Sequence, residues 1–425
     1  MTLYLKDAVF LDWQSLEIKR THLAVAVGSQ SGISFLKTLP PEDTAAAEDH
    51  VIDCAGKLVM RSFGCGHHHI YSTLARGMPA PRKIPNNFTE VLEYIWWHID
   101  KRLDLEMIEA SALASAIYCA KSGVTFIIDH HASPFAVKNS LATIAKAFDR
   151  VGIAHMLCYE ISDRDGHGPR EEGLAETDAF LAEGYQGHVG LHASFTVGDE
   201  LLQEAIALAK KHDTGLHIHV AEDRADQKDA LAKYGKRVVE RLADVGALEL
   251  RKSILCHCIH LSDYEKELLR RSGIWVAQNV ESNQNNNVGL ADYAAITENV
   301  MLGTDGMHCD MLRSAKAAFL VGQATEGISF NEIYRRFRNV HRYAQAFGFR
   351  GEGDNNLVIL NYDTPTEVTS ENFLGHFVYG LDSRHVETVI CDGKVIVEDG
   401  RIIQVNEHEV LTYAREMGAK LWDKI

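Results

Sequence analysis

Hydrophobic and polar positions in the middle of the chain alternate between short apolar runs and longer amphipathic runs. The apolar runs predict buried strands at residues 124–129, 153–158, 189–192, 215–219, 253–257, 273–278 and 300–305. The amphipathic runs predict helices at residues 103–121, 137–150, 171–183, 199–212 and 226–243. With a further strand before His67, the pattern gives about eight β/α units, the number found in a TIM barrel.

The alternative to a barrel is a doubly wound open sheet, which the sequence favours less. No Gly-x-Gly-x-x-Gly motif follows the first strand, as that fold often requires. Polar residues also recur at the carboxyl ends of the predicted strands: His67, His69, Asp129, His130, Asp163, His192, His219, His257, Gln278 and Asp305. These strand ends meet on one face of a barrel, so we expect a functional site there.

Both ends of the chain have the texture of short strands joined by turns. Residues 4–10, 22–27 and 57–60 predict strands near the start, and residues 387–391 and 394–397 predict a hairpin around Asp392-Gly393. The predicted fold is therefore α/β, a (β/α)8 TIM barrel with a small β-sandwich domain built from both termini. We assign residues 1–60 and 355–425 to the β-sandwich and residues 61–354 to the barrel, which carries the expected functional site.

Charge and length narrow the partners that the chain can have. The net charge of −16 opposes binding to nucleic acid and to anionic membranes. The start lacks a basic segment followed by a long apolar one, and no apolar run approaches the roughly 18 residues that span a bilayer. Eight cysteines in 425 residues do not make a disulfide framework. We expect a cytoplasmic protein that binds neither nucleic acid nor membrane.

Three distant segments carry residues that could close around one metal ion. His67 and His69 are two positions apart, so they share one face of a strand, while His68 faces away. His219 ends another strand, and Asp305 follows the last one within Gly303-Thr304-Asp305-Gly306. Imidazole and carboxylate groups are the ligands of hydrolytic metal sites. The metal set is therefore His67, His69, His219 and Asp305.

The remaining histidines have several possible roles. His257 could be a ligand, a general base or a buried core residue, and we favour a catalytic role. His217 shares the face of His219 but lies one layer deeper, which indicates a supporting residue. A structural zinc site at Cys256 and Cys258 is less favoured, because no second cysteine pair has the required spacing. His260 lies beyond the strand end and is expected to be structural.

The catalytic set predicted from these positions is Glu222, His257 and Asp305. A divalent ion with neutral histidine ligands lowers the pKa of a water molecule toward about 7. Asp305 or His257 can accept that proton, and Glu222 can return it to a leaving nitrogen. No lysine ends a strand in this region, so a bridging carboxylated lysine is not available. One ion is the simpler expectation.

These residues resemble the amidohydrolase superfamily, in its cytosine-deaminase-like and chlorohydrolase-like branch. The resemblance covers nearly the whole chain and is closest to SsnA-type aminohydrolases. Segments that carry it include His67-x-His69, Trp96-Trp97, residues 129–134, residues 215–223, Ser282-Asn283, residues 285–289 and residues 303–306. The resemblance implies one zinc or iron ion on the four predicted ligands, with Glu222 and His257 handling protons. It also implies a homodimer.

The activity implied by the resemblance is hydrolysis of a C–N bond in a small nitrogen heterocycle, purine-like or pyrimidine-like, with release of ammonia. Hydrolysis of a ring amide or of a chloro-heterocycle at the same site is the alternative. A barrel that has lost catalysis and serves as a scaffold is a second alternative. Candidate substrate contacts are His192, Gln278, Asn283, His130 and Arg164.

The sequence departs from the superfamily pattern at three places. Arg61-Ser62 replaces the usual Pro-Gly, and Gly64-Cys65-Gly66 replaces the usual approach to the histidine pair. Gln278 stands where a histidine is usual, and it cannot titrate. Glu90 and Glu93 lie near the position of the glutamate that often binds a nucleoside in this branch, but neither has a clear match to it, which disfavours an adenosine-like substrate.

Overall fold

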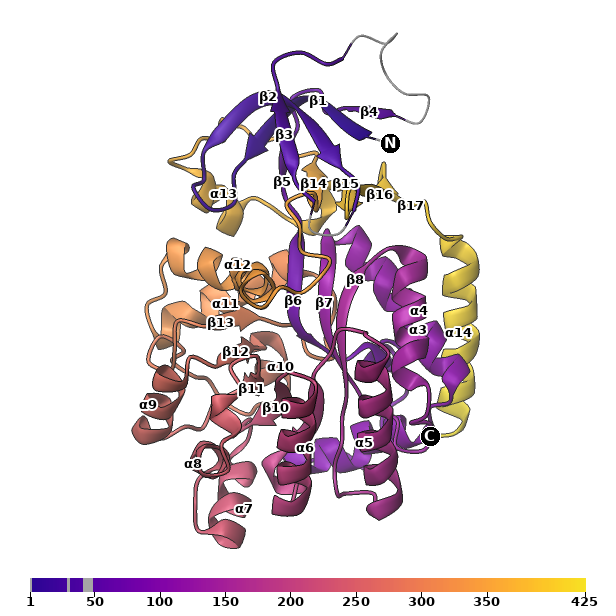
Figure 1. The fold of residues 1–425 in the computed structure, drawn as a ribbon, viewed down its shortest axis with the longest axis vertical. Coiled ribbons are helices and arrows are strands. Elements are labelled where there is room, and N and C mark those ends of the chain that lie inside the picture. Colours follow the sequence, from indigo (N-terminus) through magenta and orange to yellow (C-terminus); the bar gives the residue numbers. More distant parts are fainter. Residues whose placement is uncertain (1, 29–30, 41–48) are drawn as a thin grey trace.

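The molecule combines an α/β barrel with a smaller sheet made from both ends of the chain. The computed structural model describes residues 2–28, 31–40 and 49–425. In Figure 1 the terminal sheet lies above the barrel, and strand β6 (Phe63–His68) leads directly down from β5 (Leu58–Arg61) into the barrel wall. The two parts are therefore joined by a very short connection at the first barrel strand.

Eight parallel strands form the barrel wall. They are β6, β7 (Val124–His131), β8 (Ala154–Tyr159), β9 (Val189–Ala193), β10 (Leu216–Val220), β11 (Ile254–His257), β12 (Trp275–Gln278) and β13 (Val300–Leu302). Continuous ladders join β6 to β8 and β9 to β13. Isolated bridges from Leu157 to Gly187 and from His68 to Asp305 connect the two ladders at both seams. The predicted (β/α)8 barrel is confirmed.

Helices surround the barrel and follow most of its strands. They are α1 (Phe88–Val91), α2 (Trp97–Ile99), α3 (Leu105–Lys121), α4 (Ser140–Val151), α5 (His167–Ala182), α6 (Asp199–Lys211), α7 (Arg224–Tyr234), α8 (Val238–Asp244), α9 (Asp263–Ser272), α10 (Val280–Asn285), α11 (Met311–Thr325), α12 (Phe330–Phe347), α13 (Phe373–Tyr379) and α14 (Glu407–Asp423). Within the described ranges, no helix has the length and apolar character needed to cross a membrane.

The prediction of one continuous helix over residues 226–243 is wrong. Helix α7 ends at Tyr234, and Gly235 follows in the left-handed conformation with φ of 65°. A glycine in this conformation ends a helix by satisfying its last carbonyl groups. Helix α8 then begins at Val238, so the amphipathic pattern continued across a real break.

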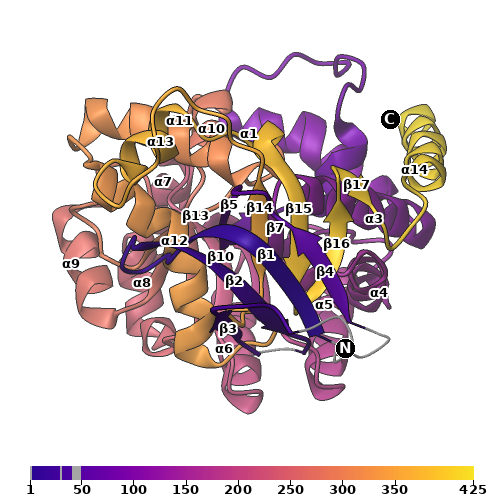
Figure 2. The ribbon, with the colours of Figure 1, turned by 90° about the horizontal axis from the view of Figure 1, so that it is seen from above.

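Among the described residues, the terminal sheet has nine strands, drawn from both ends of the chain. Beside β5 they are β1 (Thr2–Leu11), β2 (Ile18–Ala26), β3 (Ile33–Leu36), β4 (His50–Asp53), β14 (Leu357–Leu360), β15 (Val386–Cys391), β16 (Lys394–Glu398) and β17 (Arg401–Ile402). The predicted hairpin is confirmed as β15 and β16. Viewed from above, the sheet extends across the barrel end (Figure 2). Helix α14 leaves the sheet and packs against α3 of the barrel. The proposed domain boundaries stay a prediction.

The barrel interior changes from apolar at one end to polar at the other. Phe126, Met156, Ile254 and Trp275, near the starts of their strands, pack in one buried cluster with Tyr343 of α12. Helix α12 lies between the terminal sheet and the barrel strands (Figure 1). The apolar end is therefore closed, and the polar carboxyl ends of the strands face away from the terminal sheet.

The unusual residues before the histidine pair form a buried anchor for β6. The Arg61 guanidinium donates to Glu352 and to Asp354, and Glu352 also accepts from His341 Nδ1 at 2.7 Å. Arg338 Nη1 donates to the backbone oxygen of Ser62 at 2.7 Å. Both Arg61 and Arg338 are almost completely buried. These contacts fix the chain from α12 immediately before it enters the barrel.

The two glycines of β6 allow close approach of its neighbours. A Cβ atom on Gly64 would lie 2.7 Å from Val340 Cγ1, and one on Gly66 would lie 2.9 Å from the backbone oxygen of Leu302. Larger residues would push β6 away from α12 and from β13. Gly64 and Gly66 thus place the histidine pair against the last barrel strand.

Glu352→Gln should destabilise the protein by about 3 kcal/mol, because the buried Arg61 charge loses its buried ionised partner and keeps only the exposed Asp354. The free energy of unfolding, obtained from urea denaturation, measures the loss. Asp53→Asn is the control, since it breaks an exposed ion pair with Lys6 and should leave the denaturation midpoint unchanged. Equal midpoints for wild type and Glu352→Gln would contradict the anchoring role of this network.

Candidate metal centre and active-site cavity

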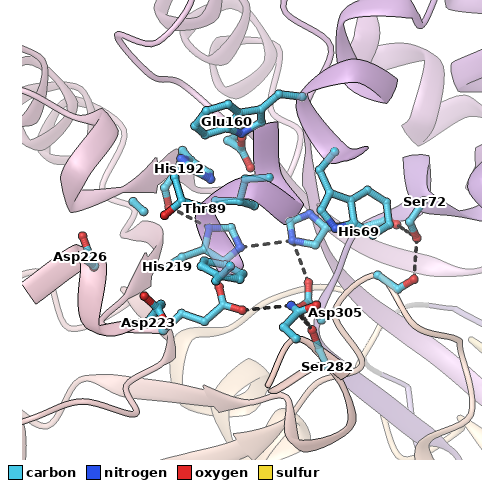
Figure 3. Close-up of a pocket in the computed structure, with 18 of the residues that line it drawn as sticks. His69, Ser72, Thr89, Glu160, His192, His219, Asp223, Asp226, Ser282 and Asp305 are labelled. Carbon is cyan, nitrogen blue, oxygen red and sulfur yellow. Dashed lines mark hydrogen bonds and ion pairs between the residues drawn. The ribbon is translucent and has the colours of Figure 1, made fainter. Parts of the chain in front are cut away.

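A cavity opens at the carboxyl ends of the barrel strands. Its lining includes His69, Ser72, Phe88, Trp96, Trp97, Glu160, His192, Phe195, His219, Glu222, Asp223, Asp226, Ser282, Asn286 and Asp305. Figure 3 shows His69, His219 and Asp305 converging at its centre. The face predicted for the site is the one on which these side chains gather.

The four predicted metal ligands lie within reach of one ion. The ligand atoms of His67, His69, His219 and Asp305 are all within 4.8 Å of one another. The Nε2 atoms of His69 and His219 are 3.2 Å apart, and Asp305 Oδ1 lies 3.0 Å from His69 Nε2 and 3.6 Å from His67 Nε2. The set combines three imidazoles with one carboxylate, which suits a divalent transition metal.

Hydrogen bonds orient each ring so that Nε2 faces this centre. His69 Nδ1 donates to the backbone oxygen of His130 at 2.6 Å, and His219 Nδ1 donates to that of His192 at 2.7 Å. His67 Nδ1 lies 2.9 Å from His217 Nε2. A ring that carries its proton on Nδ1 keeps the Nε2 lone pair for a metal. The supporting role predicted for His217 agrees with this contact.

One nitrogen of the cluster is buried without a partner. His67 is completely buried, and its Nε2 atom makes no hydrogen bond. A buried polar atom without a partner is costly unless a ligand satisfies it. The orphaned nitrogen therefore fits a metal ligand, and together with the orientation of the rings it shows that these residues suit a bound ion.

The electrostatics of the cluster favour neutral His67 and His219 rings, a protonated His69 ring and an ionised carboxylate. Burial lowers the pKa of His219 and of His67 well below the ordinary value. Burial also lowers the pKa of His69, but Asp305 outweighs it and raises that pKa to about 9. Burial raises the pKa of Asp305, yet the adjacent His67 and His69 rings hold it well below its usual range. Metal binding would displace the proton that His69 carries beside Asp305.

Glu222 and His257 lie beside this cluster. Glu222 Oε1 accepts from Asn286 Nδ2 at 3.3 Å, and Glu222 Oε2 is 3.5 Å from His257 Nε2. Burial raises the pKa of Glu222 to about 7, while His257 opposes the rise. His257 Nε2 is also 3.9 Å from Asp305 Oδ2. A carboxyl group that titrates near neutral pH can both accept and donate a proton.

The backbone at three strand ends adopts the left-handed region without glycine. Ala221, His257 and Asp305 have φ of 47°, 68° and 52°. Such conformations cost free energy for residues with a Cβ atom, and they often occur at functional sites. At His257 the turn redirects a side chain that strand alternation alone would point away from the barrel axis, because Cys256 before it already faces the interior.

Of the five predicted substrate contacts, His192 lines the cavity. Its Nδ1 atom lies 2.6 Å from Thr196 Oγ1. Burial lowers the pKa of His192 to about 4, although Glu160 opposes the decrease. His192 is therefore a neutral ring at the cavity wall.

The structure places the other four predicted contacts behind the cavity wall. His130 is completely buried beneath the cluster, with Nε2 3.2 Å from the backbone oxygens of Leu191 and His217. Arg164 pairs with Asp100 and packs over the Trp97 ring. Neither side chain lines the cavity. Existing partners hold both groups, so this geometry does not support direct contact with a substrate.

Gln278 and Asn283 are likewise turned away from the cavity. Gln278 Oε1 accepts from Arg336 Nη1 at 3.1 Å, on the outer side of the barrel wall. Asn283 Oδ1 accepts from His257 Nδ1 at 2.7 Å. Asn283 thereby leaves His257 Nε2 free to face Glu222, which makes it a positioning residue for His257.

The structure adds residues that the sequence pattern did not identify. Glu160 immediately follows β8, and its position after a strand was the available signal. Trp96, Trp97, Phe88 and Phe195 also line the cavity, but apolar residues in a connecting segment carry no periodic signal of a binding role. Within the described ranges, no group with ligand spacing contains both Cys256 and Cys258.

Comparison with known proteins places this geometry among related chains. A family model described as the amidohydrolase family matches residues 58–336. A 5-methylthioadenosine/S-adenosylhomocysteine deaminase from Syntrophomonas wolfei is 28% identical, covering 92% of this chain and 93% of that protein. A 5'-deoxyadenosine deaminase from Methanopyrus kandleri is 28% identical, covering 93% and 94%.

Solved structures show the same fold at lower identity. A zinc-bound adenosine deaminase from Xanthomonas campestris has a TM-score of 0.81 and 18% identity, covering 99% of this chain and 98% of that one. An atrazine chlorohydrolase from Arthrobacter aurescens complexed with zinc has a TM-score of 0.80 and 16% identity, covering 98% and 100%. The overall fold is therefore shared by an adenosine deaminase and an atrazine chlorohydrolase.

Protein from which a chelator has removed all metal should take up one divalent ion per chain. The variants His69→Gln and His219→Gln should each abolish stoichiometric uptake. Loss of an imidazole leaves an incomplete ligand set. Elemental analysis after dialysis against zinc or iron measures the content. His260→Gln is the matched control, because His260 bonds to the backbone oxygen of Val288 outside the cluster. Full uptake by both cluster variants would refute the ligand assignment.

Proposed function

Because this chain belongs to the amidohydrolase family, we propose that it is a metal-dependent aminohydrolase that removes an amino group from a small nitrogen heterocycle. The observation that supports this most is the convergence of His67, His69, His219 and Asp305 beside Glu222. Relatives named as deaminases of adenosine-derived compounds align over nearly the whole chain, which favours C–N bond hydrolysis over other reactions of the fold.

His67, His69, His219 and Asp305 would hold the ion, either zinc or iron. When bound, a divalent ion polarises the reacting group and makes a water molecule acidic near neutral pH. Two solved structures with the same fold contain zinc, which supports a bound metal in this chain. We expect one ion per chain.

Protons are handled by the side chains around the ligands. The water that attacks the ring carbon loses its proton to Asp305 or to His257. Asp305 Oδ2 and His257 Nε2 lie 3.9 Å apart, so either atom can accept this proton. Glu222 holds a proton at near-neutral pH and delivers it to the departing nitrogen, which leaves as ammonia. Asn286 and His257 keep the Glu222 carboxyl directed toward the reacting group.

The same groups suit hydrolysis of a ring amide or of a chloro-heterocycle, and the shared fold of the chlorohydrolase makes this the second candidate. A panel of heterocycles scored for ammonia, carboxylate and chloride separates the two. Release of chloride or carboxylate without ammonia would replace the proposal. A chain that takes up no metal would instead support a scaffold.

A homodimer, a cytoplasmic location and the absence of nucleic-acid partners remain expectations from the sequence. The small-molecule substrate is the partner on which the proposal depends. Size-exclusion chromatography with light scattering tests the assembly of two chains.

Glu222→Gln should reduce kcat roughly 100-fold or more, because an amide cannot pass the proton to the leaving nitrogen. Ammonia release on the best substrate of the panel measures the rate, and elemental analysis should show unchanged metal content. Glu183→Gln, an exposed residue after α5, is the control and should retain the wild-type rate. A Glu222→Gln rate close to that of the wild type would rule out this proton route.

Asn283→Ala should lower kcat by about 10–100-fold with little change in KM, because it releases His257 without removing a substrate contact. Steady-state kinetics on the same substrate distinguish this from direct binding. A rise in KM with unchanged kcat would instead support the contact role predicted from the sequence.

A further inference from the structure

The mouth of the cavity is covered by an aromatic roof. Its aromatic members are Phe88, Trp96, Trp97 and Phe195, and Leu92 packs among them. Most come from one segment formed by α1, the π-helical turn Leu92–Trp96 and α2. They pack in a cluster with Ile259 and Val288, which belong to connections on the far side of the barrel mouth. The roof is therefore a packed layer across the mouth.

Contacts at both ends hold the two tryptophans in place. The Trp96 ring lies edge-on to Tyr71 with centroids 6.2 Å apart, and the Trp97 ring lies 6.0 Å from His192. The Arg164 guanidinium packs over the Trp97 ring, 5.1 Å from its centroid. The cavity beneath measures about 70 Å³, whereas pockets for larger ligands span roughly 300–1,000 Å³. A flat ring suits this space, while a sugar substituent would have to displace the roof.

Glu160 forms a polar edge under this roof. It is 93% buried, with a relative exposure of 7%, and its carboxylate lines the cavity. Its oxygens lie 3.4 Å from His130 Nδ1 and 3.9 Å from Arg164 Nη2, both longer than an ordinary charge-assisted hydrogen bond. Figure 3 shows Glu160 and His192 on the opposite side of the cavity from Asp305 and Ser282. Glu160 thus retains acceptor capacity at the edge away from Asp305.

Other carboxylates at the cavity wall have protein partners. Asp226 accepts from the backbone nitrogens of Phe195 and Ala221 at 3.0 and 2.9 Å. Asp223 accepts from Ala225 N at 2.8 Å at the start of α7, and Asp100 pairs with Arg164 through Oδ2, while its buried Oδ1 has no hydrogen-bond partner among the described residues. Glu160, with only the two long contacts, is the carboxylate on the side opposite Asp305 that can accept from a ligand.

The charge of the wall selects against anionic groups. Its carboxylates are Asp100, Glu160, Glu222, Asp223, Asp226 and Asp305, and no lysine or arginine is among the described residues that line the cavity. A phosphate group would enter a region of like charge without a cation from the protein to pair with it. A neutral ring with hydrogen-bond donors has no such penalty.

We propose that Glu160 and the aromatic roof form a recognition subsite for a free heterocyclic base whose edge donates N–H hydrogen bonds and which carries neither sugar nor phosphate. The proposal rests on the proposed function, because it places the amino-bearing carbon near Glu222 and the opposite edge near Glu160. The roof packs on the ring face, and Glu160 accepts from ring N–H groups.

The first test compares Glu160→Gln with wild type in the metal-loaded protein. KM for an amino-purine or amino-pyrimidine base should rise at least about tenfold, since a charge-assisted hydrogen bond is lost. Metal content and kcat should stay within twofold of the wild type. Glu172→Gln, an exposed residue of α5, is the control and should leave both kinetic constants unchanged.

The second test measures binding without turnover, by calorimetry. The probes are a base that lacks the exocyclic amino group, its ring N-methyl derivatives, its nucleoside and its nucleoside 5′-monophosphate. Wild type should bind the base at least about tenfold more tightly than the nucleoside and the phosphate. One N-methyl derivative should lose affinity for wild type but not for Glu160→Gln, which identifies the N–H that Glu160 accepts.

The outcomes separate the subsite from the reaction. Ammonia release with equal KM for wild type and Glu160→Gln would overturn the subsite and leave the aminohydrolase proposal standing. Selective binding of the base without ammonia release from any compound would support the subsite and refute the aminohydrolase proposal. Tight binding of the nucleoside or the phosphate would overturn the subsite. A second ion in wild type that is absent from Glu160→Gln would also overturn it, by making Glu160 a ligand.

Discussion

Three buried imidazoles that keep their Nε2 atoms directed at one point are the constraint on which the site depends. Each ring is fixed through Nδ1, two of them by backbone oxygens of the neighbouring strands β7 and β9. The acceptors exist only because parallel strands hold those carbonyl groups in register. The barrel therefore orients the ligands through its own backbone, and Asp305 supplies the charge that balances them. Histidines placed on a flexible segment would turn their nitrogens toward other partners.

Strand order and strand alternation explain why the metal cluster could be predicted from the sequence. His217 and His219 alternate with Leu216 and Ile218, whose side chains pack outside the barrel, so both histidines face inward. The same alternation could have excluded Gln278, because Ala277 before it faces the interior. His257 breaks this rule, since its positive φ turns the side chain back toward the site. A local backbone conformation of this kind leaves no periodic trace in the sequence.

The elements of the fold that depend on local hydrophobic periodicity could be predicted from the sequence. The predictions failed where a local turn or a contact with a distant residue determines the conformation. The barrel and the β15–β16 hairpin follow from runs of apolar residues and a turn. The break at Gly235 interrupts a pattern that remains amphipathic on both sides. Arg164 is held by Asp100, which lies 64 positions away in the sequence, so its direction could not be read from its own segment. Glu160 became visible only once its neighbours from other strands were placed.

The residues before the histidine pair that depart from the superfamily pattern all hold β6 close to its neighbours. Arg61 and Ser62 replace a rigid turn by a buried network that ties the chain to α12, and Gly64 lets β6 lie directly against that helix. Helix α12 also closes the apolar end of the barrel and contacts β13, the strand that precedes Asp305. Helix α12 thus contacts both strands that lead to ligands: β6, which carries His67 and leads to His69, and β13, which precedes Asp305. The separation between these ligands is consequently set by packing at the opposite end of the barrel, where substrate never reaches.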